Sequence, residues 1–275
     1  MKLFILIISF IVLYIPTFRE LIELWATNED YGHGFLILPI SLYLVWRRRD
    51  ELSRLPINPS NWGIALIALW GFFYVLGSIG NISNFTYLSL LLFPIGTVLT
   101  LFSGQAVRKI LFPTFFLLFM FPVPSEIYAK ITNPLLLIST NMSFKILTVL
   151  NLPVLQEGNI LTLPNYTMKV VLACSGIRSI VTIMALALLV GYLMTSSNII
   201  RAVIFIISIP IAILGNVLRI TVTALLAHFV SLQAAEGYSH TFAGLVTFAV
   251  SLIILYGSTE LILWLSNTTV PTFNR

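Results

Sequence analysis

Long apolar runs with few or no charged residues recur along this chain of 275 residues, and they restrict what it can fold into. About 20 such residues in a row are enough to cross a bilayer as a helix. Hydrophobic residues make up 58% of the chain and charged residues only 9%. Soluble domains carry about 25% charged residues, so this chain has too little polar surface to face water. We therefore expect an all-α polytopic membrane protein.

The apolar runs predict about eight transmembrane helices, joined by short polar loops. Their expected bounds are 2–18, 35–46, 62–76, 85–102, 110–123, 177–194, 200–218 and 242–265. Pro210 and the pair Gly215–Asn216 predict a kink or break in the seventh helix. The first run is kept as a helix because no A-x-A cleavage site follows it. We find no internal repeat and treat residues 1–275 as a single transmembrane domain.

Two basic clusters predict the orientation of the chain. Arg47–Arg49 and the pair Arg108–Lys109 should both lie in the cytoplasm, because loops rich in Lys and Arg are retained there. Counting helices from these clusters places both termini in the cytoplasm. The net charge of +5 then reflects loop orientation, and we expect no nucleic-acid partner. We expect membrane lipid to surround the protein.

Two segments between the fifth and sixth helices have a different character. Residues 125–152 place polar side chains near helical spacing, which predicts a helix lying in the membrane interface. A spanning helix there is the alternative, and it would invert the orientation of everything that follows. Residues 153–171 alternate around Pro164–Asn165, which predicts a small β-hairpin. On the preferred count this hairpin lies on the outer face, directly before Cys174.

Cys174 is the only cysteine of the chain, so no internal disulfide can form. This argues against a thiol oxidoreductase, which needs paired cysteines. Cys174 stands at the start of an apolar run, where the amides of a helix N-terminus favour the thiolate. Arg178 follows one helical turn later. A lone cysteine in an apolar protein is also often a small buried hydrophobe, so both interpretations stay open.

Arg219 and His240 are expected to share the outer face with Cys174, each at the end of a different helix. An imidazole beside a thiol is the usual way to obtain a nucleophilic thiolate, and a cation can stabilise the oxyanion of acyl transfer. The alternative interpretation is that Arg219 reaches the interface by snorkelling and that His240 is an interfacial side chain. His228 is expected to be structural. Nucleotide-binding glycine motifs are absent, and we expect no cofactor and no metal.

At these residues the sequence resembles the exosortase family over nearly its whole length. The ordered set of matching segments is Tyr31–Ile40, Phe121–Pro124, Ala173–Ser179, Asn216–Arg219 and His240–Gly244. The form Cys-Ser-Gly-Ile-Arg-Ser is more similar to the bacterial exosortases than to the archaeal branch.

The resemblance implies a membrane-embedded cysteine protease and transpeptidase of the bacterial inner membrane, with its active site facing the periplasm. Cys174, Arg219 and His240 would be its catalytic residues. We expect Arg178, Asn216 and His33 to contact the substrate. The substrate would be the C-terminal sorting signal of a secreted protein: a Pro-Glu-Pro-type motif, an apolar helix and a basic end. The acceptor would be linked to a glycan or a lipid.

Two other classes of function remain open from the sequence. A polysaccharide or small-anion transporter would use Arg219 as an anion contact and leave Cys174 inert. A non-catalytic subunit of surface-polymer biosynthesis would need neither side chain for chemistry. Transporters often show repeated halves with broken helices in matching positions, and no such repeat is visible in this sequence.

Overall fold

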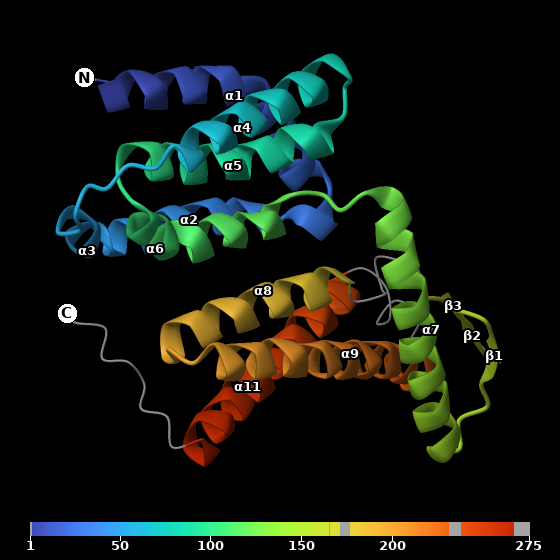
Figure 1. The fold of residues 1–275 in the computed structure, drawn as a ribbon. Helices are drawn as coiled ribbons and strands as arrows, with labels where there is room; N and C mark the ends of the chain where they lie inside the picture. Colours follow the sequence, from blue (N-terminus) through green and yellow to red (C-terminus); the bar gives the residue numbers. More distant parts are fainter. Residues whose placement is uncertain (1, 165, 171–176, 231–237, 267–275) are drawn as a thin grey trace. The chain divides into compact units, whose positions relative to one another are not determined.

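A computed structural model gives the fold (Figure 1). It describes the backbone of residues 2–164, 166–170, 177–230 and 238–266, with the side chains of all of these except 2–7, 177, 178, 238–241 and 243. Contacts within the chain divide it into two compact units, Met1–Pro124 and Ser125–Arg275. Each unit is described by itself below.

The first unit consists of helices. The α-helices and 3-10 helices have the bounds α1 Lys2–Thr27, η1 Glu29–Tyr31, α2 Gly34–Arg47, α3 Arg49–Ser53, α4 Trp62–Ile79, α5 Ser83–Leu101, α6 Gly104–Phe116 and η2 Leu117–Met120. The prediction that the first helix ends at Phe18 is wrong. Tyr14, Thr17, Leu21 and Trp25 are all buried, and this three-to-four-residue spacing carries the helix through the acidic region to Thr27.

Helices α4 and α5 form a tightly packed hairpin because small residues meet along it. A Cβ atom built on Gly63 would lie 2.6 Å from the backbone nitrogen of Thr100, and one on Gly77 would lie 2.6 Å from that of Thr86. Backbones this close are typical of helix pairs in membranes, where small residues allow close approach. The two glycines therefore set the separation of α4 and α5 at both ends of the hairpin.

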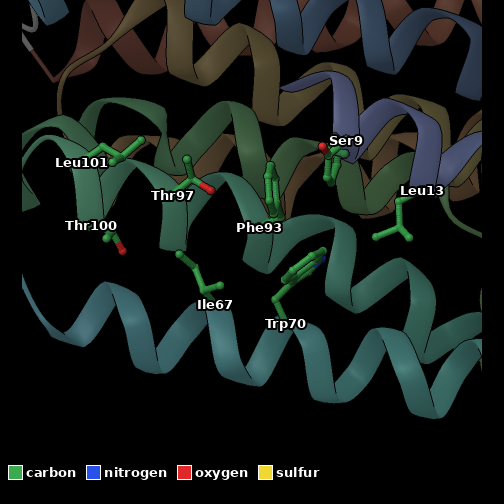
Figure 2. Close-up of a pocket in the computed structure, with 9 residues that line it drawn as sticks. Ser9, Leu13, Ile67, Trp70, Phe93, Thr97, Thr100 and Leu101 are labelled. Carbon is green, nitrogen blue, oxygen red and sulfur yellow. The ribbon is translucent and has the colours of Figure 1, made fainter. Parts of the chain in front are cut away.

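A lateral cavity of about 270 Å³ opens between α1, α4 and α5 (Figure 2). Phe10, Leu13, Ile67 and Phe93 give it mostly apolar walls. Trp70 also lines it, and its indole Nε1–H donates to the Tyr14 hydroxyl at 2.9 Å. The indole is thereby satisfied inside an apolar region, where an unpaired donor would be costly.

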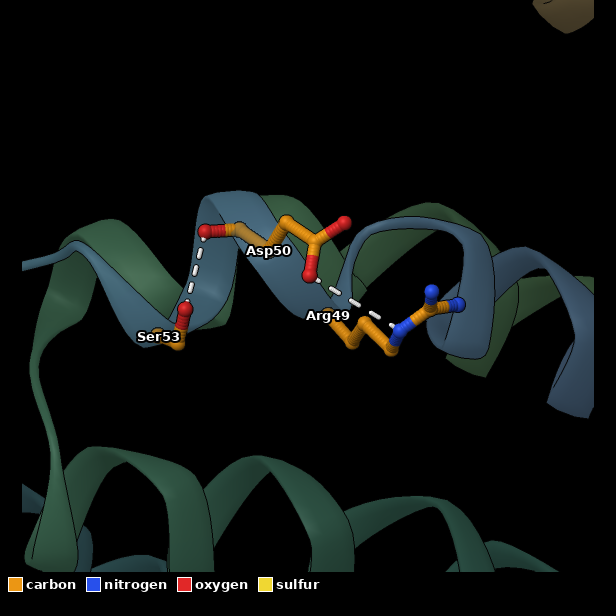
Figure 3. A network of polar contacts seen from close by, with 3 residues as sticks. All are labelled: Arg49, Asp50 and Ser53. Atoms are coloured by element: carbon orange, nitrogen blue, oxygen red, sulfur yellow. Dashed lines mark hydrogen bonds and ion pairs between the residues drawn. The ribbon is translucent and has the colours of Figure 1, made fainter. Parts of the chain in front are cut away.

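Polar contacts organise the expected cytoplasmic side of this unit. In α3, the Arg49 side chain lies 3.7 Å from the Asp50 carboxylate, and the Ser53 hydroxyl donates to the Asp50 carbonyl at 3.0 Å (Figure 3). The Lys109 ammonium donates to Glu51 at 2.5 Å, which joins α3 to α6. This hydrogen bond lowers the pKa of Glu51 below its usual value.

Within the described residues, the second unit combines four helices with a small sheet. Its elements are α7 Ser125–Val149, β1 Leu155–Glu157, β2 Ile160–Leu163, β3 Tyr166–Lys169, α8 Ile177–Met194, α9 Asn198–Phe229 and α11 Tyr238–Leu265. The strands pair antiparallel in the order β1-β2-β3. Strands β2 and β3 occupy the residues where the sequence predicts a hairpin, and β1 adds a third strand. Placement of the sheet on the outer face stays a prediction.

Two apolar clusters form the core of this unit, one at each part of α9. The first joins α8, α9 and α11 through buried side chains that include Ile183, Ile204 and Leu255. The second joins α7 and the sheet to the C-terminal third of α9, where Ile220 and Ala224 are buried. In Figure 1, α7 and the three strands accordingly lie at one end of α9.

The prediction of a break in the seventh helix is wrong, because α9 is one continuous helix of 32 residues. It passes through Pro210 and continues beyond Leu218, since buried residues at 211, 212, 216, 217, 220, 221 and 224 keep helical spacing. At Gly215 a built Cβ would lie 2.1 Å from the Ser251 hydroxyl oxygen. Gly215 therefore serves close packing of α9 on α11.

Four helices of the described residues are long and apolar enough to cross a membrane: Trp62–Ile79, Ser83–Leu101, Asn198–Phe229 and Gly244–Leu265. The count is five if Gly104–Met120 and Ser125–Val149 together form one broken span. Helix α2 has 14 residues and is about 21 Å long, which is shorter than the hydrocarbon core of about 30 Å. The total of eight spans, the cytoplasmic termini and the interfacial position of α7 stay predictions.

Candidate active site

Arg219 lies well inside α9, ten residues before its last residue, Phe229. Arg219 therefore does not end the helix, and its expected place at the end of the membrane span stays a prediction. Asn216, one turn earlier on the same face, is only 2% exposed. Helix α9 thus presents an amide and a guanidinium side by side, at the level where the helix passes from one apolar cluster to the other.

Three helices of the second unit meet around Arg219 and enclose a small cavity. Its walls come from α8, α9 and α11, through Ser179, Ala212, Gly215, Asn216, Arg219, Thr247, Phe248 and Ser251. The cavity has a volume of about 10 Å³, which is close to what one water molecule requires. Most of its lining residues are polar or small, although both neighbouring clusters are apolar.

Glycine allows α11 to approach the guanidinium. A Cβ built on Gly244 would lie 3.3 Å from both Cζ and Nη2 of Arg219. Any side chain at position 244 would therefore crowd the planar group. Further along α11, the Thr247 hydroxyl donates to the Gly244 carbonyl at 3.1 Å, and the Ser251 hydroxyl donates to the Thr247 carbonyl at 2.9 Å. These bonds use the hydroxyl hydrogens within the helix and leave the oxygens as acceptors.

The charge of this site is positive. Arginine stays protonated in proteins, and none of the eight residues that line the cavity carries a carboxylate. A fixed cation beside a small polar cavity can stabilise negative charge that develops on a reacting oxygen. The arrangement therefore suits a reaction that passes through an oxyanion.

The sequence predicts Cys174, Arg178 and His240 at this site, and none of their side chains is among the described ones. Cys174 lies outside the described residues. Arg178 and His240 belong to the first turns of α8 and α11, and their side chains lie outside the described set. Ser179, five residues after Cys174, lines the cavity. His240 precedes Gly244 by one helical turn, and a Cβ built on Gly244 would lie 3.3 Å from the Arg219 guanidinium.

His33 occupies a different environment, in the first unit. Its Nε2–H donates to the Phe119 carbonyl at 2.8 Å, and the Trp25 indole donates to the Met120 carbonyl at 3.0 Å. Tyr31 forms a third hydrogen bond, to the backbone of Val123. Burial lowers the pKa of His33, and the bond to Phe119 opposes this shift. These contacts show His33 holding the segment before Pro124, and its contact with substrate stays a prediction.

Sequence reasoning missed Ser179, Gly244, Thr247 and Ser251 as parts of the site. Three of them recur at positions 244, 247 and 251 of an apolar helix, and this small-and-polar spacing was the signal available. The described residues contain no group of three or more His, Cys, Asp or Glu side chains arranged to hold a metal.

Comparison with known proteins adds one finding. The family model described as transmembrane exosortase (Exosortase_EpsH) matches residues 25–257, which is most of the chain. The chain belongs to the exosortase family. No curated protein and no solved structure matches it. The matched range includes the segments of both units that carry His33, Cys174, Arg219 and His240. As an exosortase, the chain is a membrane protein of a family of transmembrane transpeptidases.

Proposed function

We propose that this exosortase is a cysteine protease and transpeptidase that acts on the C-terminal sorting signals of secreted proteins. The observation that carries the proposal is the cavity beside Arg219. Its walls include Ser179, from the helix that follows Cys174, and Thr247, from α11, whose first turn carries His240. Helix α8, which follows Cys174, and helix α11, whose first turn carries His240, thus meet at the cation that α9 carries.

The proposed reaction is acyl transfer. The Cys174 thiolate attacks the carbonyl carbon of the scissile peptide bond, after His240 has taken the thiol proton. Arg219 stabilises the oxyanion, and His240 returns the proton to the leaving amine as the C–N bond breaks. The acyl-enzyme then passes to an acceptor amine, which gives a new peptide bond, or to water, which gives the free acid. Asn216 and Arg178 would position the substrate.

The depth of Arg219 supports a site at the membrane surface. Arg201 and Arg219 are separated by 18 residues of one helix, which corresponds to about 27 Å. The hydrocarbon core is about 30 Å thick, so the two arginines fit opposite edges of it. The Arg201 guanidinium donates to the Thr195 carbonyl at the turn between α8 and α9. With that turn in the cytoplasm, Arg219 faces the periplasm of the inner membrane.

A substrate tail of the proposed kind would present its motif on the periplasmic side of the membrane, where the site is proposed to lie. Its basic end is retained in the cytoplasm by the same rule that orients the enzyme, and its apolar helix spans the bilayer. The motif before the helix then emerges at the periplasmic surface, at the level proposed for Cys174. The acceptor would carry a glycan or a lipid, which would attach the secreted protein to the cell surface.

Because Cys174 is the only thiol, labelling and activity can be measured on the same atom. The experiment is co-expression with a reporter that ends in a Pro-Glu-Pro-type motif, an apolar helix and a basic end. Wild-type protein should release the tail, and Cys174→Ala should not, with both proteins equally abundant in the membrane. A chloroacetamide should alkylate Cys174 more slowly in His240→Ala, because the general base is lost.

Two results would contradict the proposal. Full processing by Cys174→Ala would remove the nucleophile. Absence of processing by wild type, combined with alkylation that does not depend on His240, would favour a transporter or a non-catalytic subunit.

A further inference from the structure

Strand β3 is an edge strand of the small sheet. The order β1-β2-β3 places β2 on one side of it, and no other described strand pairs with it. Thr167 and Lys169 are exposed, whereas Met168 is buried in the cluster with α7 and α9. One face of β3 therefore packs on the protein, and one long edge lies opposite to β2.

The register shows which backbone groups point to that free edge. The Val170 amide donates to the Asn159 carbonyl at 2.9 Å, and this pair continues the register Ile160↔Lys169 and Leu161↔Met168. Hydrogen-bonded and non-hydrogen-bonded pairs alternate in an antiparallel ladder. Met168 and Tyr166 therefore bond to β2. Thr167 and Lys169 direct their N–H and C=O groups away from β2.

This edge leads to the candidate active site. Lys169 is five residues before Cys174, the proposed nucleophile. Met168 and Val170 belong to the same buried cluster as Ile220, the residue that follows Arg219. The strand is thus attached both to the segment that carries the thiol and to the helix that carries the guanidinium.

We propose that the edge of β3 opposite β2, which no described strand covers, binds the substrate main chain, as an added β-strand, on the N-terminal side of the bond to be cleaved. This inference rests on the proposed function. An extended peptide gains affinity from main-chain hydrogen bonds when it joins a sheet edge. Thr167 and Lys169 offer two donors and two acceptors, spaced by about 7 Å along the strand. The occupant is therefore an extended peptide segment, held by its backbone and delivered to Cys174.

Strand β1 supplies a matched control on the opposite edge. Its register with β2 is Leu155↔Thr162, Gln156↔Leu161 and Glu157↔Ile160. Since Leu161 bonds to β3, Gln156 directs its N–H away from the sheet, as Thr167 does. A proline at either position removes one outward donor and keeps the ladder bonds, with the same restriction of φ.

The test compares Thr167→Pro with Gln156→Pro in the purified full chain, with kcat/KM for a soluble peptide that carries the Pro-Glu-Pro-type motif as the readout. Thr167→Pro should lower kcat/KM by about fivefold, the effect of one lost hydrogen bond, and Gln156→Pro should leave it unchanged. Equal rates in the two variants would overturn the inference. So would a change of oligomeric state in Thr167→Pro alone, because the edge would then bind a second copy of the chain.

A second measurement does not depend on folding of the variants. Wild-type protein is given peptides N-methylated at one backbone position at a time. Pairing with an edge predicts that methylation lowers the rate at every second position, because alternate amides point to the edge. If methylation lowers the cleavage rate without a period of two, the inference is overturned, and the proposed function is not. If wild-type protein cleaves neither the peptides nor the reporter, both the proposed function and this inference are overturned.

Discussion

Substitution of Gly244 tests whether contact with α11 positions the Arg219 guanidinium for catalysis. A Cβ at this position lies 3.3 Å from Cζ, whereas carbon atoms prefer separations of about 3.5–4.0 Å. The guanidinium must therefore move by about 0.2–0.7 Å in Gly244→Ala. If a misplacement of about 1 Å costs about 10²-fold in rate, this smaller shift should cost about 3- to 25-fold. Gly244→Val should cost about 100-fold, because its methyl groups reach further.

Gly257 on the same helix is the matched control. A Cβ built on it meets no atom within 4 Å. Alanine is favoured over glycine in a helix by about 1 kcal/mol, so both Gly257→Ala and Gly244→Ala should keep or raise the thermal stability. The assay is the rate of reporter processing in membranes, normalised to the amount of enzyme. Processing at the wild-type rate by Gly244→Val would refute the reasoning, because Arg219 would then tolerate displacement.

Four further predictions follow from the structure and the proposals. Gly34→Ala should destabilise the protein by about 2–4 kcal/mol in thermal unfolding, because its Cβ would lie 2.3 Å from the Trp25 indole nitrogen; Gly71→Ala, which meets no atom within 4 Å, should not. Arg219→Lys should abolish reporter processing with the protein still folded, if planar contact is needed. The stability advantage of wild type over His33→Asn should shrink as the pH falls from about 7.5 to about 5. The folded state lowers the pKa of His33, so the unfolded state takes up more protons in this range. In the proposed substrate, moving one proline of the Pro-Glu-Pro-type motif by one residue should slow cleavage, since only prolines two residues apart can both face away from β3.

The first three of these four predictions each have an outcome that would count against them. Equal melting temperatures for the two glycine variants of the first unit would show that the indole tolerates a methyl group. Processing by Arg219→Lys would reduce the role of the guanidinium to charge alone. A pH-independent difference for the histidine variant would mean that the imidazole has the same pKa in both states.

Periodicity predicted most elements of the fold, and it failed where burial continued beyond the apolar runs. Helix α8 has the bounds Ile177–Met194 that its apolar run predicts. Helix α1 extends past Phe18 because Leu21 and Trp25 continue its buried stripe among acidic residues. Helix α9 continues past Leu218 because Ile220 and its neighbours bury against the sheet. Hydropathy alone cannot detect burial against a partner that is distant in sequence.

The candidate site, too, could be predicted only in part from the sequence. Arg219 could be selected from sequence because an arginine between apolar runs is rare and costly. The contact of Arg219 with Gly244, and the approach of Ser179 to the same cavity, depend on how α8, α9 and α11 pack. No local pattern encodes these pairings. Strand β1 escaped prediction because three residues, Leu155–Glu157, are too few to show alternation.

The hydrogen bonds around η2 have a consequence for exchanging parts between exosortases. Prolines at 122 and 124 lack an amide hydrogen, so the chain there cannot complete a regular ladder by itself. Trp25 and His33 donate to the carbonyls just before it instead. Two stretches about ninety positions apart in sequence thus depend on each other for these hydrogen bonds. A chimaera that imports only one of them would misfit at this joint, whereas a chimaera that imports both should assemble normally.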